Sequence, residues 1–217
     1  MKSANPEFME KFFEPNFSLS WNGLMQGKLW QLFTFFLTQP TADGVSFHFF
    51  FVLFAKLCLL WFTAISIFEV KGPLHFLSVY LGSALVGAFF VLPILAFYPT
   101  ASFINLIGPI YGIMVAWIML HPNSCILLMS RIPFRPTSIL GWIFFSNLFF
   151  DFLDGKYLEI LFYSGCVIAC YFYALLLWGC KGPFKKLASL ENALLEKTYF
   201  LRKAQPKCTI YKFREKP

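Results

Sequence analysis

Residues 75–98 read HFLSVYLGSALVGAFFVLPILAFY, a run that contains no Asp, Glu, Lys or Arg. A helix needs about 20 consecutive apolar residues to cross the hydrocarbon core of a bilayer, and this run is long enough. Because lipid offers no water to backbone polar groups, a segment in that environment is expected to be helical. The stretch therefore predicts a membrane-spanning helix, and it decides the class of the fold.

Similar apolar segments lie on both sides of this run. They are apolar all round rather than alternating, which disfavours a β-barrel. The fourth segment is shorter than the others. The sequence therefore predicts an all-α fold, a polytopic membrane helical bundle with about five transmembrane helices. The five predicted spans are about Phe47–Phe68, His75–Tyr98, Ala101–Leu120, Ser138–Leu153 and Tyr157–Trp178.

The overall composition supports a membrane protein. Of the 217 residues, 58% are hydrophobic and 13% are charged, and 30 are Phe. Soluble domains have about 45–50% apolar and about 25% charged residues, so this chain has too few polar groups to cover a soluble domain of its size. Disordered chains have low hydrophobicity, so the high apolar content of this chain excludes disorder.

The chain divides into three regions. Residues 1–46 form an N-terminal region with an aromatic segment, Gly27–Leu37, that is too short to cross and is expected at the membrane interface with Trp30 and Lys28 at headgroup level. Residues 47–179 form the transmembrane domain, and residues 180–217 form a basic tail. An amphipathic helix is predicted over Leu187–Lys203 of the tail, either as a helix that binds a partner or senses lipid, or as a solvated anchor.

The positive charge is concentrated at the C-terminal end. The net charge is +7, and ten of the 18 Lys and Arg residues lie after residue 180. Basic segments of membrane proteins stay in the cytoplasm, so the C-terminus is predicted to be cytoplasmic and the N-terminal region to lie outside. This distribution indicates anionic lipid headgroups rather than nucleic acid as the partner of the basic residues.

No metal or cofactor site is indicated by the cysteines and histidines. The six Cys residues form no CxxC pair with zinc spacing. Cys166 and Cys170 share a helix face, but no His or carboxylate joins them there to complete a ligand set. We therefore expect the cysteines to pack as small hydrophobic side chains.

Small residues four positions apart recur in three of the predicted spans. The pairs are Gly108 and Gly112 in the third span, Ser83 and Gly87 in the second, and Gly165 and Ala169 in the fifth. Membrane helices approach closely where small residues line one face. The second, third and fifth spans are therefore predicted to form a tight central bundle.

Polar side chains within the predicted spans suggest a polar site inside the bundle. Lys56 lies in the middle of the first span, where burial of a charge costs about 2.5–3.5 kcal/mol on insertion scales. It either pairs with Asp151 or a backbone carbonyl, or extends along its own stem to the interface. His48, Lys56 and Asp151 are therefore candidates for a polar site.

The order of these motifs resembles the rhomboid family of intramembrane serine proteases and its inactive relatives, including the derlins. The resemblance covers about Gly27 to Trp178. Its motifs are Trp30-Gln31-Leu32-Phe33-Thr34 before the first span, Asn105-Leu106-Ile107-Gly108-Pro109-Ile110-Tyr111-Gly112 in the third, and Gly165 with Ala169 in the fifth. Gln31 departs from the family's Trp-Arg pair. Bacterial rhomboids usually have a further span before this loop, so the chain is either a five-span variant or begins downstream of the natural start.

The resemblance places hydrocarbon side chains at both catalytic positions. The family's nucleophile position falls on Ile107, with Gly108 and Tyr111 matching well, and its base position falls on Phe162. Neither side chain can attack a carbonyl or accept a proton. The resemblance therefore implies a pseudoprotease of a bacterial inner membrane, without cofactor, which contacts the lipid bilayer and binds transmembrane segments of client proteins.

Two other functions are consistent with the sequence. An active rhomboid-type serine endopeptidase would need a displaced dyad, such as Ser164 with His48. A small transporter would use Lys56 and Asp151, although the sequence has no internal repeat of the kind found in many transporters.

Overall fold

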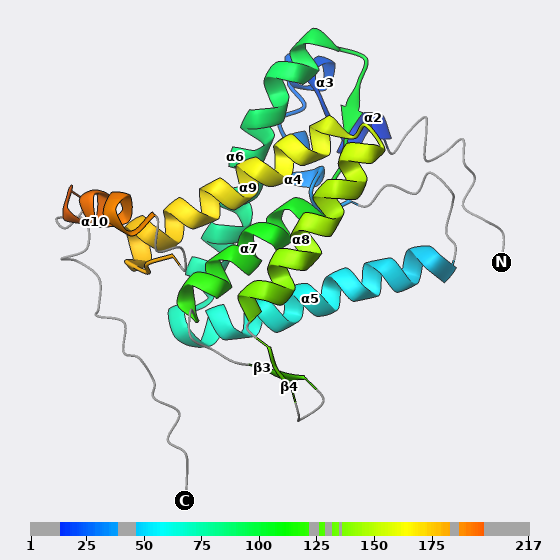
Figure 1. The fold of residues 1–217 in the computed structure, drawn as a ribbon. Helices are drawn as coiled ribbons and strands as arrows, with labels where there is room; N and C mark the ends of the chain where they lie inside the picture. Colours follow the sequence, from blue (N-terminus) through cyan, green and yellow to red (C-terminus); the bar gives the residue numbers. More distant parts are fainter. Residues whose placement is uncertain are drawn as a thin grey trace, which may run out of the picture.

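The computed structural model describes residues 14–38, 47–121, 126–128, 132–134, 136–182 and 187–197, and this part of the chain is predominantly helical. Five long helices dominate it (Figure 1). They are α5 (Phe47–Lys71), α6 (Pro73–Phe97), α7 (Ile107–Leu120), α8 (Pro136–Leu153) and α9 (Tyr157–Tyr173), which η2 (Ala174–Trp178) continues as a π-helical turn. Shorter elements are α2 (Glu14–Phe17), β1 (Leu19–Ser20), α3 (Trp21–Met25), α4 (Gln31–Thr34), β2 (Ser102–Phe103), β3 (Ile126–Leu128), β4 (Ile132–Phe134) and α10 (Ala188–Lys197).

Three helices of the described part are long and apolar enough to cross a membrane. They are Phe49–Lys71, Pro73–Phe97 and the continuous Tyr157–Trp178. The helices α7 and α8 are apolar but shorter. All five helices thus lie where the sequence predicts apolar segments, and three of them reach the length of a span.

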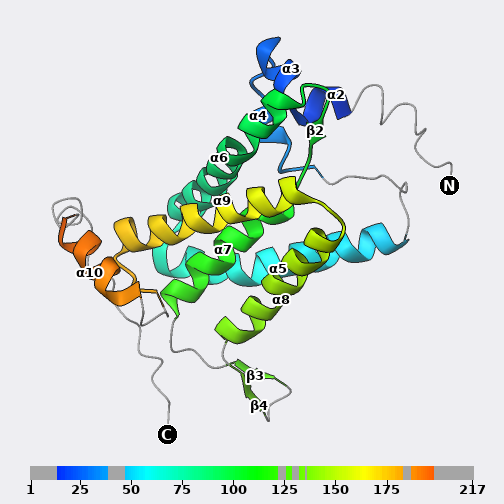
Figure 2. The same ribbon diagram turned by 45° about the horizontal axis from the view of Figure 1, so that its top comes forward.

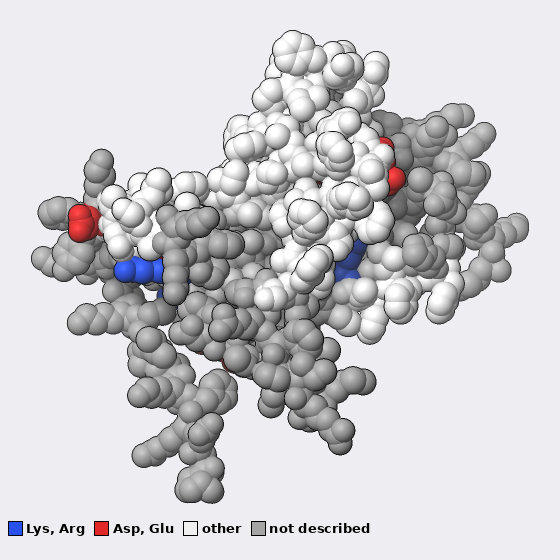
Figure 3. All heavy atoms as spheres, in the orientation of Figure 1, with Lys and Arg blue, Asp and Glu red and all other residues white. Residues whose placement is uncertain are grey.

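The outer surface of the bundle is apolar, as expected for a protein surrounded by lipid. Trp61 of α5 is 71% exposed and Phe145 of α8 is 62% exposed. In Figure 3 the described atoms on this face are almost all uncharged. A soluble monomer rarely exposes so much contiguous apolar surface, so the exposure fits insertion into a membrane.

The predicted start of the third span at Ala101 is wrong. Residues Ser102–Phe103 form β2, which pairs antiparallel with β1, and Leu19 lies opposite Phe103 in the register. The helix begins only at Ile107, where the side chain of Asn105 caps its first backbone N–H groups. The helix is therefore 14 residues long rather than the length of a full span.

The helix α9 lies against both α6 and α7 and forms the centre of the core (Figures 1 and 2). The predicted small residues make this contact possible. A Cβ on Gly165 would lie 2.9 Å from the Cα of Gly87, and a Cβ on Gly112 would lie 2.6 Å from the Cys170 Sγ. The prediction of a tight bundle of α6, α7 and α9 is thus confirmed by the packing.

The aromatic segment before α5 contributes to the core as well as to the surface. Trp30 is half exposed, but Phe35 and Phe36 have no exposed surface. The Trp30 Nε1–H donates to the Asn16 carbonyl (2.9 Å), and the Thr34 hydroxyl donates to the Phe17 carbonyl (3.0 Å). The Trp-to-Thr motif therefore ties the chain around α2 to α4, and the two phenylalanines anchor the segment in the bundle.

The helix α10 occupies only part of the predicted amphipathic helix, since residues 198–203 lie outside the described part. It lies beside the end of α9 (Figure 2). The Glu191 side chain is buried, with 1% exposed, and accepts hydrogen bonds from the Tyr171 hydroxyl and from the Gly182 N–H (3.2 Å). This carboxylate holds α10 against the end of the bundle.

Candidate functional site

The two positions to which the resemblance assigns a catalytic dyad are Ile107, at the start of α7, and Phe162, in the first half of α9. Ile107 is the first residue of α7, and the next residue, Gly108, faces the Phe162 ring of α9 directly. Phe162 has no exposed surface. The residue that follows Ile107 thus packs against the Phe162 ring, and both positions of the resemblance carry hydrocarbon side chains.

An aromatic cluster fills the space around Phe162. The Phe162 ring contacts Phe35 (centroids 5.4 Å apart) and Phe103 (5.2 Å), both edge to face. The side chain also fills space against Gly87, where a Cβ would lie 2.7 Å from the ring. Such edge-to-face contacts are favourable between buried rings, so this position is a packed part of the core.

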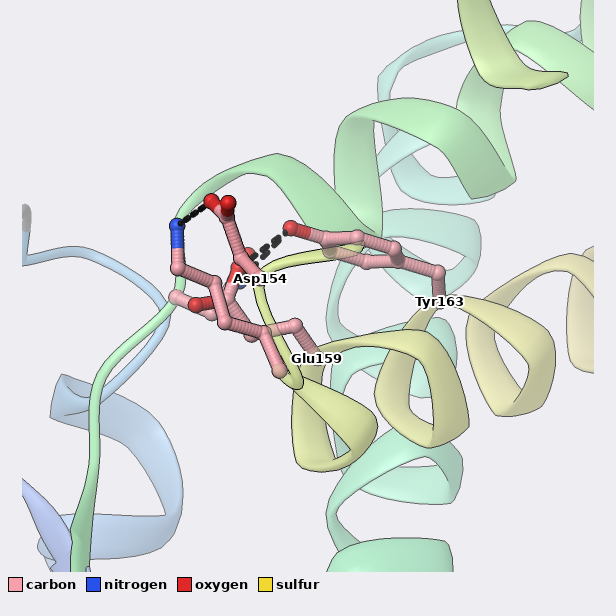
Figure 4. Close-up of polar contacts among 5 residues, drawn as sticks. Asp154, Glu159 and Tyr163 are labelled. Atoms are coloured by element: carbon pink, nitrogen blue, oxygen red, sulfur yellow. Dashed lines mark hydrogen bonds and ion pairs between the residues drawn. The ribbon is translucent and has the colours of Figure 1, made fainter. Parts of the chain in front are cut away.

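A polar cluster of Asn105, Glu159 and Tyr163 lies beside the aromatic one. The Asn105 Oδ1 accepts hydrogen bonds from the N–H of Ile107 (2.9 Å) and of Gly108 (3.2 Å). Its Nδ2 donates to the Tyr163 hydroxyl (3.0 Å) and to the Glu159 Oε2 (3.2 Å). The Tyr163 hydroxyl in turn donates to Glu159 (2.8 Å), and Figure 4 shows it pointing toward the turn between α8 and α9.

This polar cluster is suited to holding helices together. Asn105 is 5% exposed, and it satisfies N–H groups that an α-helix leaves without partners at its first turn. Through Tyr163 and Glu159 it fastens the start of α7 to the start of α9. Tyr163 and Glu159 were not predicted as partners from the sequence, although their spacing of four residues puts them on one face of a helix.

The turn between α8 and α9 carries charged residues at the surface. Lys156 Nζ and Asp154 Oδ2 form an ion pair at 2.9 Å, and both side chains are about half exposed. The hydrogen bond to Asp154 raises the pKa of the Lys156 ammonium. The charges at this end thus include carboxylates of Asp151, Asp154 and Glu159 together with the Lys156 ammonium.

The predicted polar site of His48, Lys56 and Asp151 stays a prediction, because it includes a side chain that the structure does not describe. Lys56 interacts electrostatically with Glu159. The side chain of His48 lies outside the described part, and the Ser164 hydroxyl donates to the Ile160 carbonyl of its own helix (2.8 Å). Such a back-bonded Ser is common in membrane helices.

A different Ser and His meet at the C-terminal end of α7. The Ser66 Oγ of α5 and the Nε2 of His121 are 3.3 Å apart. The His121 Nδ1 lies 3.3 Å from the Trp117 carbonyl, so Nδ1–H donating to that carbonyl would leave Nε2 to accept from Ser66. This pair was not predicted from the sequence, because Ser66 and His121 are 55 positions apart and only the packing of α5 against α7 brings them together.

Two grooves open on the surface of the bundle. The first, which we call the α7–α8 groove, lies among α7, α8, α9 and α10 and has a volume of about 450 Å³. The second, the α6–α9 groove, lies between α6 and the end of α9 with η2 and has a volume of about 360 Å³. Both are within the usual range of ligand pockets, about 300–1,000 Å³.

No group of three or more His, Cys, Asp or Glu side chains that could hold a metal ion occurs in the described ranges. Cys166 and Cys170 are buried free thiols, and Cys170 makes a contact of 3.8 Å with the Val79 carbonyl. From α9, Cys166 packs against Gly87 of α6 and Cys170 packs against Gly112 of α7.

Comparison of the chain with protein-family models, with curated proteins and with solved structures finds no match. The resemblance to rhomboids therefore rests on the motif residues of this chain alone.

Proposed function

We propose that this chain is a rhomboid-like membrane protein without protease chemistry, which binds transmembrane helices of client proteins. The observation that carries the proposal is the pair Ile107 and Phe162. The Phe162 ring packs against Gly108, the residue that follows Ile107, and lies among other aromatic rings. Side chains of this composition supply neither a nucleophile nor a base.

A five-span arrangement in a bacterial inner membrane, with a cytoplasmic C-terminus, belongs to the same proposal. It is supported by contacts between helix ends. The start of α7 contacts the start of α9 through Asn105, and the Ser66–His121 contact joins the later part of α5 to the end of α7. The Trp178 Nε1 lies 3.4 Å from the His75 Nδ1, which joins the end of η2 to the start of α6. Consecutive helices thus alternate in direction, as repeated crossings require.

The α6–α9 groove is the surface that best fits a client helix. It lies between two of the helices long enough to span a membrane, so its occupant is a component of the membrane. Ser78 and Gly82 line it from α6, and a Cβ on Gly82 would meet no atom within 4 Å. Ser83 and Gly87 already serve the contact with α9, whereas this second row of small residues is open to a further helix.

The test uses a fluorescent 22-residue transmembrane peptide with a small-xxx-small face and the full-length labelled chain in liposomes. We expect saturable energy transfer between the two. The variant Gly82→Leu fills the groove and should weaken the apparent affinity at least five-fold. Gly141→Leu is the matched control, since it also replaces an open Gly but lies in the α7–α8 groove.

A peptide of leucines alone should bind more weakly than the small-xxx-small peptide, because it lacks the small face that permits close approach. Equal energy transfer for both peptides, or an unchanged affinity in Gly82→Leu, would contradict the proposed client site.

A second candidate function rests on Ser66 and His121. In this function the Ser66 Oγ attacks an ester or amide carbonyl carbon while its proton passes to His121 Nε2. The imidazolium then protonates the leaving alcohol or amine as its bond to the acyl carbon breaks, and water hydrolyses the acyl-serine. A serine-directed fluorophosphonate probe separates the two functions. Labelling that disappears in Ser66→Ala and persists in Ser164→Ala would establish a hydrolase and overturn the proposal of a protein without protease chemistry.

A further inference from the structure

The hydroxyl of Tyr111 is a buried polar group with no hydrogen-bond partner in the described part of the chain. Tyr111 is 1% exposed and lines the α7–α8 groove. Its ring is held edge to face between Phe144 of α8 (centroids 5.1 Å apart) and Tyr163 of α9 (5.3 Å). Buried hydroxyl groups in proteins are nearly always hydrogen-bonded, so this one indicates a ligand that brings an acceptor.

The remaining lining of the groove is apolar and follows the length of α7. Met114, Ile118 and Met119 continue from Tyr111 along this helix, and Val167 and Ile168 face them from α9. From Tyr111 to Met119 the helix rises about 12 Å. Methionine side chains adapt to flexible apolar ligands.

The helix α10 bounds the far end of the groove. Leu187 and Leu190 line it there, next to Tyr171, and the hydrogen bond from Tyr171 to Glu191 fixes α10 in place. The groove is therefore elongated, apolar and limited in length, with one hydrogen-bond donor near its start.

We infer that the α7–α8 groove binds one acyl chain of a zwitterionic glycerophospholipid, with an ester carbonyl oxygen accepting a hydrogen bond from the Tyr111 hydroxyl. The end of the groove at α10 favours a single acyl chain, which can end there, over a transmembrane helix, which has to continue across the membrane. The Met114 and Met119 side chains in the lining adapt to a flexible chain.

The charges near Tyr111 select among lipids. Asp151 interacts electrostatically with the Tyr111 hydroxyl, and Glu159 is hydrogen-bonded to the neighbouring Tyr163. Lys56 interacts with Glu159, and Lys156 is paired with Asp154. A fatty-acid carboxylate at Tyr111 would lie close to Asp151 and be repelled, whereas a neutral ester carbonyl is not. The ammonium group of an ethanolamine or choline headgroup is attracted by the same carboxylates.

The experiment is native mass spectrometry of the full-length chain in detergent after delipidation. Dioleoyl phosphatidylethanolamine, dioleoyl phosphatidylglycerol or oleate is then added back. We expect one phosphatidylethanolamine per chain, with at least five-fold lower occupancy in Gly141→Leu and about three-fold lower occupancy in Tyr111→Phe. Gly82→Leu and Tyr98→Phe are the matched controls, because Gly82 lies in the other groove and Tyr98 lies at the exposed end of α6.

Occupancy that is equal in Gly141→Leu and in the unmodified chain would overturn the inference, as would tighter binding of oleate or phosphatidylglycerol. If Tyr111→Phe does not fold, the occupancy of Gly141→Leu and the comparison of the three lipids still test the inference.

The inference is independent of the proposed client site. Loss of helix-peptide binding in Gly82→Leu tests the client site, and loss of lipid in Gly141→Leu tests the acyl-chain site. Peptide binding that is lost in Gly141→Leu instead would place a helix in the α7–α8 groove and contradict the lipid assignment.

Discussion

The ring of Phe162 in α9 occupies the space that a side chain on Gly108 in α7 would fill. This relationship joins two features of the sequence that are 54 positions apart, the small pair in the third apolar segment and the aromatic residue ahead of Gly165. It also explains the tight contact of the two helices, since only a glycine leaves room for the ring. The Phe162 side chain of α9 therefore packs as a knob into the hole that Gly108 leaves on α7.

Gly108→Ala should destabilise the protein by about 1–3 kcal/mol, because the added methyl group overlaps with the Phe162 ring. Thermal unfolding in detergent micelles measures the effect. Gly141→Ala is the control, since a Cβ there meets no atom within 4 Å. The double variant Gly108→Ala with Phe162→Leu should recover part of the loss. Additive effects of the two changes would show that the residues are not in direct competition for space.

Asn105→Ala should cost about 1–3 kcal/mol, since it removes the cap of α7 and leaves Glu159 with one donor fewer. The same unfolding measurement checks this. Asn147→Ala is a matched control, because the Asn147 amide donates only to the Ile143 carbonyl of its own helix among the contacts described. A similar small loss in both variants would mean that the Asn105 cluster contributes little to the association of α7 and α9.

The positions of the long helices could be predicted from the sequence, but their ends and their side-chain partners could not. Apolar runs locate α5, α6 and α9 because hydrophobicity is a local property. The start of α7 depends on the pairing of Phe103 with Leu19 and on the capping by Asn105, which are contacts between distant parts of the chain.

The burial of the aromatic segment before α5 also could not be predicted from the sequence. Phe35 and Phe36 have the composition of residues at a membrane interface, yet both are packed in the core. Hydrophobicity alone does not distinguish a side chain in lipid from one buried against other helices. Glu191 is the converse case. A charged residue in an amphipathic pattern is predicted to lie on a solvated face, but the Glu191 carboxylate is buried and accepts hydrogen bonds from Tyr171 and Gly182.

Glu191→Ala should release α10 from the end of α9. Without the carboxylate, the Tyr171 hydroxyl and the Gly182 N–H lose their acceptor, and only the leucines hold the helix. Hydrogen exchange of residues 188–197 should become several-fold faster in detergent. Glu196→Ala, on the same helix but away from these hydrogen bonds, should leave the exchange unchanged. Equal exchange rates in the two variants would show that Glu191 does not hold α10 against the end of α9.

Lys156→Met should change the stability very little. The ion pair with Asp154 raises the pKa of Lys156, so its contribution is present below the ordinary value of 10.5 and is lost as the pH rises through the raised value. Because both side chains are about half exposed, solvent screening limits the contribution to below about 1 kcal/mol. Unfolding at pH 8 should show a small difference between the variant and the unmodified chain, which disappears in strongly alkaline buffer or at high salt. A difference that grows with pH would have the wrong sign for this pair.

Phe162→His should be more damaging than Phe162→Leu, although histidine would restore the residue that the rhomboid resemblance expects at this position. A neutral imidazole carries one N–H donor and one acceptor, and the neighbours Phe35, Phe103 and Gly87 offer hydrocarbon surface to both. Leaving such groups unpaired in a buried site costs about 1–3 kcal/mol beyond the change in packing. Leucine loses ring contacts but introduces no polar atom. Thermal unfolding of the two variants in the same detergent makes the comparison, and a histidine variant as stable as the leucine variant would show that the site can hold water or a polar partner. In that case the position would retain the character of a catalytic cavity, and labelling of the double variant Ile107→Ser with Phe162→His by a fluorophosphonate probe would become the decisive measurement.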